Sequence, residues 1–382
     1  MNSKNFFLVL FMFVHFNCFS QSNNFDIVLE IGPDELIGAF ITDVNMGPDG
    51  SVAVALNDLA RVNLYDLQGE LIKEYGRRGR GPGDFSNLMS VHVSESAIYA
   101  LDAGPGGRVN IFERDEPERF RTFNLPRSGE SYPLRMWYLY DGNFMVEYRP
   151  GYTIANLEES ITSTYAVISR DDNLNSEEVF QHQSNEMFLS SSNGGFSVSD
   201  MPFGRENHIV PLQDGFIHNW SDDKELTRID AESGIVVDTI DPNFSAERVS
   251  LSDQDYSRYF LDELGIPEGE DVNEALHQLS TDASIGIKLR GVQAKLESRD
   301  ELHTTFSLYR WVAGDSNSLC FGLPDADRVV TRVECTDLDG EPIRNGKIDA
   351  SIEILGLQGR FLYGIRKLDQ GMRSVVVLEL TP

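Results

Sequence analysis

Positive charge is scarce in this chain of 382 residues, where 32 Lys and Arg stand against 61 Asp and Glu for a net charge of −29. So acidic a protein repels phosphate groups, which excludes nucleic acid and anionic lipid headgroups as partners. The excess of acidic residues favours solubility in a saline medium. A surface that binds cations or a cationic partner is the other interpretation.

Long apolar runs are also missing, apart from one close to the N-terminus. Lys4 and the apolar segment 6–16 predict a secretory leader over residues 1–20, whose removal takes the net charge to −30. The run is too short for a membrane span, so we predict no transmembrane segment. Cys18 leaves a lipoprotein anchor open, although residues 15–17 are not the small ones such an anchor needs. We expect an exported protein, either periplasmic or secreted.

Cysteine is the third scarce residue, with three in the chain. A fold built on disulfides is thereby excluded, and about 360 residues can bury a full core without them. Cys320 and Cys335 lie on neighbouring predicted strands but about four residues out of register. That offset separates their side chains too far for a disulfide and favours two free thiols.

Motifs that would name a reaction are absent. The chain has no G-x-S-x-G nucleophile elbow, no H-E-x-x-H and no C-x-x-C, so neither a serine hydrolase of that type nor a strong zinc signature is indicated. What the chain does contain is a repeat. Arg61-Val62-Asn63-Leu64-Tyr65 returns 47 residues later as Arg108-Val109-Asn110-Ile111-Phe112, and each copy is followed by a polar turn and another alternating strand. A period of this size, filled with short strands, indicates β-propeller blades.

The strand pattern predicts an all-β, six-bladed β-propeller as a single domain over residues 21–382. The last blade has only three strands of its own, whereas the strand-like segment 25–31 has no blade. We therefore expect residues 25–31 to pair with 374–380 and close the ring. A seventh blade requires hidden strands within residues 156–200.

A helical insertion is predicted over residues 245–301, between blades 4 and 5. Ser252, with Asp255 three residues on, starts a helix that Gly265 ends. Two more helices are expected, over 272–279 and 285–296. The insertion either seals apolar surface or acts as a lid or docking arm.

The stretch Tyr75–Phe85, YGRRGRGPGDF, carries a family resemblance. With Ala-Leu-Asp at 100–102 and the two Arg-Val-x-apolar-aromatic repeats, it resembles the bacterial exported six-bladed β-propeller family related to NHL repeats. The likeness is sharp over residues 40–125 and diffuse elsewhere. It implies a six-bladed exported protein but no activity, because related propellers include binders, sensors, hydrolases and lyases.

The glycine-rich stretch itself predicts a structural connection between blades rather than a phosphate loop, because a strand and no helix follows it. Its arginines are expected to pair with nearby carboxylates. Phe85 is expected to plug between two blades. The predicted inter-blade loop consists of Gly79, Gly81, Pro82, Gly83, Asp84 and Phe85.

Ligands of propellers bind at the axial mouth, where inner strands and loops converge. No catalytic residue can be named from the sequence. If a divalent cation such as calcium is bound on the axis, the candidate ligands are Asp43, His92, Asn207 and His218. Strand histidines such as His92 and His218 more often serve packing than metal binding.

These observations favour a monomeric, non-enzymatic binding or scaffold protein that needs no cofactor. Its expected partner is a protein, peptide or glycan held at one face of the ring or by the insertion. The alternative function is an axial-metal hydrolase or lyase of the lactonase type, with its site at the propeller mouth.

Overall fold

The computed structural model describes residues 25–32, 36, 40–104, 106–126, 131–139, 143–151, 161–169, 176–192, 195–264, 295, 303–326, 329–368 and 372–380. Within these residues, no helix is long and apolar enough to cross a membrane. The predicted leader and the helices expected over 272–279 and 285–296 lie outside the described residues, save for Lys295.

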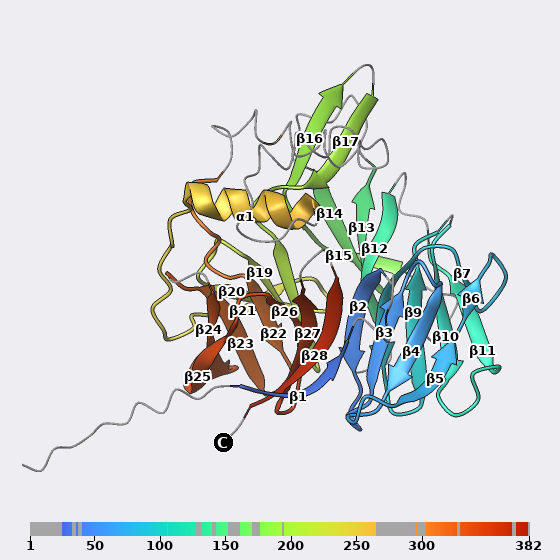
Figure 1. The fold of residues 1–382 in the computed structure, drawn as a ribbon. Helices are drawn as coiled ribbons and strands as arrows, with labels where there is room; N and C mark the ends of the chain where they lie inside the picture. Colours follow the sequence, from blue (N-terminus) through green and yellow to red (C-terminus); the bar gives the residue numbers. More distant parts are fainter. Residues whose placement is uncertain are drawn as a thin grey trace, which may run out of the picture.

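The protein is a six-bladed β-propeller, with six four-stranded antiparallel sheets arranged around a central axis (Figure 1). Each blade is written here from its inner to its outer strand. The first three blades are β2 (Ile41–Met46), β3 (Val52–Leu56), β4 (Arg61–Tyr65), β5 (Leu71–Tyr75); β8 (Leu88–Val93), β9 (Ala97–Asp102), β10 (Arg108–Glu113), β11 (Phe120–Asn124); and β12 (Ser131–Tyr138), β13 (Phe144–Pro150), β14 (Thr162–Ile168), β15 (Ser176–Gln183). The last three are β18 (Asn207–Pro211), β19 (Gly215–Trp220), β20 (Leu226–Asp230), β21 (Val236–Ile240); β22 (Trp311–Gly314), β23 (Ser318–Pro324), β24 (Val330–Asp337), β25 (Pro342–Asp349); and β26 (Ile352–Gln358), β27 (Phe361–Lys367), β28 (Arg373–Glu379), β1 (Asp26–Ile31).

The sixth blade takes its outer strand from the other end of the chain. β1 pairs antiparallel with β28, from Asp26 opposite Glu379 to Ile31 opposite Val375, which are the two segments expected to pair. The carboxylate of Glu30 accepts hydrogen bonds from Arg366 at 2.8 Å and from the Ser374 hydroxyl at 2.7 Å. The N-terminal strand is thus held by a backbone ladder and by side chains of the last two strands.

Burial is greatest in the second strand of a blade and least in its outer strand, whereas the innermost strand, which borders the cavity, is partly exposed. β3, with the sequence VAVAL, is buried at every position because neighbouring blades cover both of its faces. In the outer strand β21, Val236 and Val237 are exposed and only Ile240 is buried. Small and β-branched apolar residues therefore occupy the strands that lie between blades.

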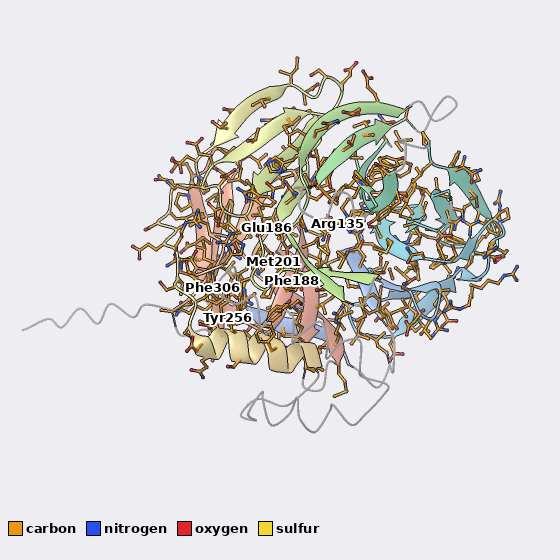
Figure 2. The ribbon with its side chains drawn as sticks, turned by 90° about the horizontal axis from the view of Figure 1, so that it is seen from above. Arg135, Glu186, Phe188, Met201, Tyr256 and Phe306 are labelled. Atoms are coloured by element: carbon orange, nitrogen blue, oxygen red, sulfur yellow. A yellow bond between two sulfur atoms is a disulfide. The ribbon has the colours of Figure 1, made fainter. Side chains whose placement is uncertain are left out.

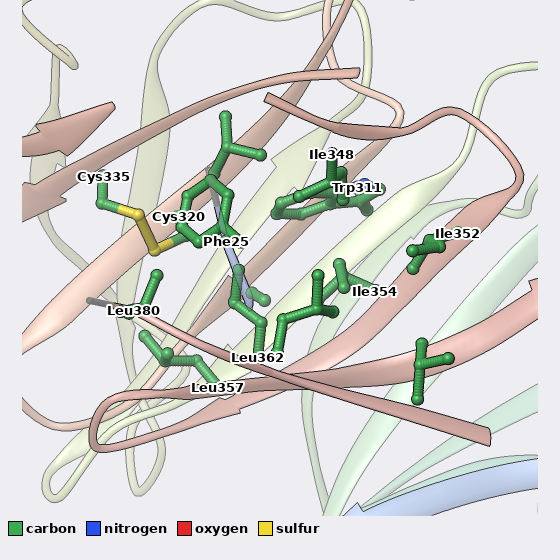
Figure 3. Packing of buried hydrophobic residues seen from close by; sticks show 14 residues of the cluster. Phe25, Trp311, Cys320, Cys335, Ile348, Ile352, Ile354, Leu357, Leu362 and Leu380 are labelled. Atoms are coloured by element: carbon green, nitrogen blue, oxygen red, sulfur yellow. A yellow bond between two sulfur atoms is a disulfide. The ribbon is translucent and has the colours of Figure 1, made fainter. Parts of the chain in front are cut away.

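Blades 5 and 6 are joined by a core that includes Phe25, Trp311 and Leu362 (Figure 3). Within this core, Cys320 and Cys335 form a disulfide, so the expectation of two free thiols was wrong. The expected offset of about four residues is absent, because β24 continues past Cys335 and pairs with β23 over its length. In the actual register Cys320 lies directly opposite Cys335, with 4.1 Å between their Cα atoms.

In the part of the chain that the structure describes, three additions break the four-stranded pattern, and each lies between the outer strand of one blade and the inner strand of the next. They are the two-residue strands β6 (Arg77–Arg78) and β7 (Asp84–Phe85), the hairpin β16 (Met187–Ser192) and β17 (Gly195–Asp200), and helix α1 (Asp253–Leu264). The hairpin and α1 lie at the same end of the ring (Figure 1). The region 156–200 does hide strands, but they form a hairpin on that end and not a seventh blade.

Helix α1 begins where the sequence predicts. The Ser252 amide donates to Asp255 Oδ2 at 2.7 Å, and the Asp255 amide donates back to the Ser252 hydroxyl at 3.3 Å. This reciprocal capping satisfies amides that a helix start leaves without partners. Tyr256 and Phe260 on its inner face are buried, which fixes α1 to the ring.

Candidate functional site

A central cavity of about 1930 Å³ runs along the axis and is lined by residues of all six inner strands. Most of these inner strands contain a β-bulge, at which the strand bends. The bulge lies between Ile41 and Asp43 in β2, between Leu88 and Ser90 in β8, and between Pro133 and Arg135 in β12. The first three inner strands thus place one polar residue, Asp43, Ser90 or Arg135, at the equivalent step after the bulge.

Asp43 and Ser90 use this step to join neighbouring inner strands. The Val91 amide donates to Asp43 Oδ2 at 2.9 Å, and the Met136 amide donates to the Ser90 hydroxyl at 3.3 Å. Burial raises the pKa of Asp43 to about 7, although the Val91 and Val44 amides act to lower it. Asp43 therefore holds two blades together in an environment that disfavours its charge.

Arg135 cannot continue this series, because a guanidinium has no acceptor for an amide of the next strand. Close packing joins β2 to β8, β8 to β12, β18 to β22, β22 to β26 and β26 to β2, but within the described residues β12 and β18 pack less closely. The Arg135 side chain is instead exposed inside the ring, toward the centre of the view in Figure 2. The surrounding blades keep bulk water at a distance and so act to lower the pKa of Arg135, but the carboxylates of Glu147, Glu206 and Glu353 shift it upward overall.

Blade 4 supplies a histidine to the same region. His208 lines the cavity, and burial together with the positive charge of Arg135 lowers the pKa of His208 to about 3. A hydrogen bond with the Tyr309 carbonyl acts in the opposite direction. Within the described residues, Nε2 of His208 has no partner. The ring is therefore neutral, with Nδ1 as the donor to Tyr309 and Nε2 as an acceptor.

The four candidate metal ligands are divided among separate contacts. Asp43 accepts amides at the seam of blades 1 and 2, and His92 stacks on Tyr138 with ring centroids 4.6 Å apart. Only Asn207 and His218 meet, where Asn207 Oδ1 lies 2.7 Å from His218 Nε2. Burial lowers the pKa of His92 to about 4 and that of His218 to about 3. In the part of the chain that the structure describes, no three His, Cys, Asp or Glu residues are placed to share a metal ion.

An aromatic cluster lies at the end of the cavity that carries α1 and the hairpin. Its centre is Phe203, which follows β17 and has a φ of +56°, unusual for a residue other than glycine. The Phe203 ring contacts Tyr256 and Tyr259 of α1 and Phe306, with ring centroids 5.2, 5.4 and 5.1 Å away. Of the four, Phe203, Tyr259 and Phe306 line the cavity. We call these four residues the mouth cluster.

Charged contacts fix the hairpin and the insertion to blade 4. His303 Nε2 lies 2.5 Å from Glu186 Oε2, which also accepts the Arg205 amide at 2.7 Å. Burial acts to raise the pKa of Glu186, but these two contacts lower it overall. The Arg205 guanidinium reaches the Thr305 carbonyl at 3.2 Å and Asp222 at 2.9 Å. The base of the hairpin and the end of the insertion are thus one connected network.

The glycine-rich connection lies at the seam of blades 1 and 2. Asp84 Oδ1 accepts from Arg77 at 2.9 Å, and its Oδ2 accepts from the Gly81 amide at 2.9 Å. The Phe85 ring is fully buried and lies 6.0 Å from the Phe112 ring. The remaining predicted residues Gly79, Pro82 and Gly83 belong to the same turn between β6 and β7. None of the six lines the central cavity.

The charge of the cavity differs from that of the whole chain. Its described lining holds nine carboxylate residues and seven Lys and Arg residues, whereas acidic residues outnumber basic ones 61 to 32 overall. The interior of the ring therefore repels an anionic group much less than the outer surface does. Sequence reasoning missed this enrichment, because Arg135, Arg258 and Arg310 stand in three unrelated segments.

No protein-family model and no curated protein matches the chain. Similar solved structures include a protein of Bacteroides fragilis described as exported, at 12% identity and a TM-score of 0.48 over 93% of this chain and 94% of that one. Virginiamycin B lyase of Staphylococcus aureus has 9% identity and a TM-score of 0.44 over 93% of this chain and 99% of that one. The calcium-binding regucalcin of Agrobacterium tumefaciens has 8% identity and a TM-score of 0.44 over 89% of this chain and 91% of that one. At such identities and TM-scores, the activity of these proteins cannot be assigned to this chain.

Proposed function

We propose that this chain is an exported binding protein whose ligand enters the central cavity from the end that carries α1 and the hairpin. The observation that supports this most is the lining of that mouth. Glu186, Phe203 and Arg258 bring a carboxylate, an aromatic ring and a guanidinium to it from the segment just before the hairpin, the segment after the hairpin and the insertion. Mixed side chains on a braced rim are typical of ligand recognition.

The rim is also built to stay in place. The network of Glu186, Arg205 and His303 joins the hairpin to the insertion, and the mouth cluster packs α1 against Phe203. A rim held in this way loses less conformational entropy when a ligand binds, because its side chains are already ordered. A peptide or a glycan of a few units is the class of ligand that fits a cavity of about 1930 Å³.

The alternative, an axial-metal hydrolase or lyase, requires several ligands to meet on the axis. A thermal-shift series with calcium, zinc and manganese, each added alone, tests it. A rise in melting temperature with any one ion that Asp43→Asn or His218→Gln abolishes would favour the alternative over the binding function.

The proposed function is tested with two defined probes: a pool of random tetrapeptides and a pool of neutral oligosaccharides. Equilibrium dialysis of each pool against the purified protein, read by mass spectrometry, measures retention. We expect at least one pool to be retained in a saturable way. If neither pool is retained at millimolar concentration, the proposal is wrong.

A pair of variants tests whether the ligand lies inside the ring. Leu355 is partly exposed at the bulge of β26 and lines the cavity, so Leu355→Trp narrows it. Val237→Trp adds the same bulk to the exposed outer strand β21 and serves as the control. We expect retention to fall about tenfold for Leu355→Trp and to stay unchanged for Val237→Trp. Equal retention by both variants would place the ligand elsewhere.

A further inference from the structure

Arg135 stands apart from the other arginines of the cavity lining. No hydrogen bond or ion pair joins its guanidinium to any residue that the structure describes. By contrast, Arg310 donates to the Thr331 hydroxyl at 3.1 Å, Arg366 pairs with Glu30 at 2.8 Å, and Arg373 donates to the Ile41 carbonyl at 3.3 Å. A guanidinium has five N–H donors, and inside a ring of protein they are most strongly satisfied by an anion.

The surroundings of Arg135 limit which anion it can receive. Glu147, Glu206 and Glu353, from the strands and loops of three blades, act electrostatically on its charge, although none of them forms an ion pair with it in the described structure. Glu147 is already engaged, because its Oε1 accepts from the Ser163 hydroxyl at 2.6 Å. A second negative charge on the ligand would be repelled by these carboxylates. A single carboxylate therefore suits this position better than a phosphate dianion.

His208 adds a complementary requirement from the neighbouring blade. Its Nε2 is an acceptor without a partner in the described structure, and His208 lines the same cavity as Arg135, whose positive charge acts on the imidazole ring. A buried acceptor of this kind is best satisfied by an N–H or O–H of the ligand. Arg135 and His208 together are therefore complementary to a ligand that has a carboxylate with a hydrogen-bond donor beside it.

The C-terminal residue of a peptide carries both groups, a carboxylate and the N–H of its own peptide bond. We infer that Arg135 and His208 receive the free C-terminus of a peptide, with the carboxylate on the guanidinium and the last N–H on Nε2 of His208. This inference rests on the proposed function and names its ligand class. A neutral oligosaccharide offers donors but no carboxylate and is not selected by this pair.

The remainder of the peptide extends from Arg135 toward the mouth of the cavity. There the rings of Phe203, Tyr259 and Phe306 offer apolar and aromatic contact to side chains upstream of the C-terminus. Leu355, opposite on β26, offers further apolar surface. Specificity for the terminus thus comes from Arg135 and His208, and affinity for the preceding residues comes from the rim.

The test uses the random tetrapeptide pool in two forms, as free acids and as C-terminal amides, both acetylated at the N-terminus. The amide removes the negative charge and keeps the last N–H. For the wild-type protein we expect the acid pool to bind at least about tenfold more tightly than the amide pool. Equal binding of the two pools would overturn the inference.

Three variants assign the effect to named side chains. Arg135→Gln should reduce binding of the acid pool to the level of the amide pool and leave the amide pool unchanged. Arg135→Lys should recover only part of the preference, because an ammonium cannot form the paired hydrogen bonds of a guanidinium. His208→Phe should weaken both pools by a similar factor, because both retain the last N–H. Circular dichroism and melting temperature verify that each variant folds. If Arg135→Gln does not fold, the comparison of acid and amide pools is made with Arg135→Lys.

The outcomes separate this inference from the proposed function. If peptides are retained, Leu355→Trp blocks them and the Arg135 variants do not change the acid preference, the inference fails and the binding function stands. If no pool is retained in a way that depends on Leu355, the proposed function fails as well. Inorganic phosphate is the competitor. Displacement of the acid pool by phosphate at equal affinity would mean a general anion site and would overturn the assignment to a peptide terminus.

Discussion

The ring of Phe85 occupies the space where a side chain at Gly76 would begin. A β-carbon built on Gly76 would lie 2.1 Å from the Phe85 ring, and the φ of Gly76 is +78°. Glycine is therefore required here twice, once by the backbone conformation and once by the buried ring between blades 1 and 2. The glycine-rich segment thus lets the chain turn closely around an aromatic plug.

Replacement of Gly76 by alanine should destabilise the protein markedly. We expect Gly76→Ala to lower the free energy of unfolding by about 2–3 kcal/mol, because strain and the displacement of Phe85 add together. Gly359→Ala is the matched control, since Gly359 has a φ of +60° with no atom within 4 Å of its β-carbon position. The control should lose only about 1 kcal/mol. Urea denaturation measures both, and equal losses would mean that Phe85 moves aside freely.

Asp43 should make the protein less stable as the pH rises. Its folded pKa is about 7, above the unfolded value of about 3.9, so the native state binds more protons than the unfolded chain between these values. The free energy of unfolding contributed by this group is therefore greatest below pH 4 and falls as the pH rises toward 7.

Asp43→Asn should remove this slope, because the asparagine side chain carries no charge and its oxygen can still accept one of the two amides, Val91 or Val44, that the carboxylate accepts. We expect little difference from the wild type at pH 4 and a gain of about 1–3 kcal/mol at pH 8. Urea denaturation at the two pH values measures the change. A variant that is less stable than the wild type at pH 8 would show that the charged carboxylate is favoured at the seam.

The disulfide between Cys320 and Cys335 should stabilise blade 5 and with it the ring. It joins directly opposed residues of β23 and β24 with a sequence separation of 15. We expect the double variant Cys320→Ala, Cys335→Ala to lose about 2–4 kcal/mol, mainly because its unfolded chain is less constrained. Dithiothreitol should lower the melting temperature of the wild type and leave that of the variant unchanged. A wild type indifferent to reductant would contradict this.

The contact between Glu186 and His303 should hold the hairpin to the insertion. The pKa of Glu186 is lowered in the folded state, so its contribution to stability is present above the unfolded pKa and is lost as the pH falls through the folded value. Glu186→Ala removes the acceptor of the Arg205 amide as well. We expect hydrogen exchange at Arg205 and at residues 303–306 to quicken while the blades keep their protection.

Glu116→Ala is the control for that experiment. Glu116 pairs with Arg119 at 3.3 Å on the exposed surface of blade 2, where an ion pair contributes little. Exchange at Arg205 should remain as in the wild type. If both variants leave residues 303–306 protected, the aromatic mouth cluster alone holds the rim and the charged contact is dispensable.

Local patterning was enough to predict most of the blades. Short apolar strands such as Val52–Leu56 and the repeat at Arg61 and Arg108 reflect a sheet geometry that each segment imposes on its own side chains. The capped start of α1 is equally local, because Ser252 and Asp255 bond to each other's amides. The hairpin β16–β17 was missed because its Ser- and Gly-rich strands have little apolar alternation.

The candidate site could not be read in the same way. Asp43, His92, Asn207 and His218 were chosen as residue types suited to metals, and tertiary packing divided them among separate contacts. Arg135 gave no signal, since a single arginine in an alternating strand usually faces solvent. Because the six blades close into a ring, the Arg135 side chain lies in the central cavity and not on the outer surface.

The sequence by itself determined the period of the repeat, the six blades and the turns that need glycine, because each depends on contacts between residues near one another in the chain. Tertiary structure decided the register that joins Cys320 to Cys335, the position of the hairpin and α1 at one mouth, and the isolation of Arg135 within the cavity. These features depend on the exact register between strands and on contacts between residues more than a hundred positions apart, such as Glu186 and His303, which no local pattern specifies.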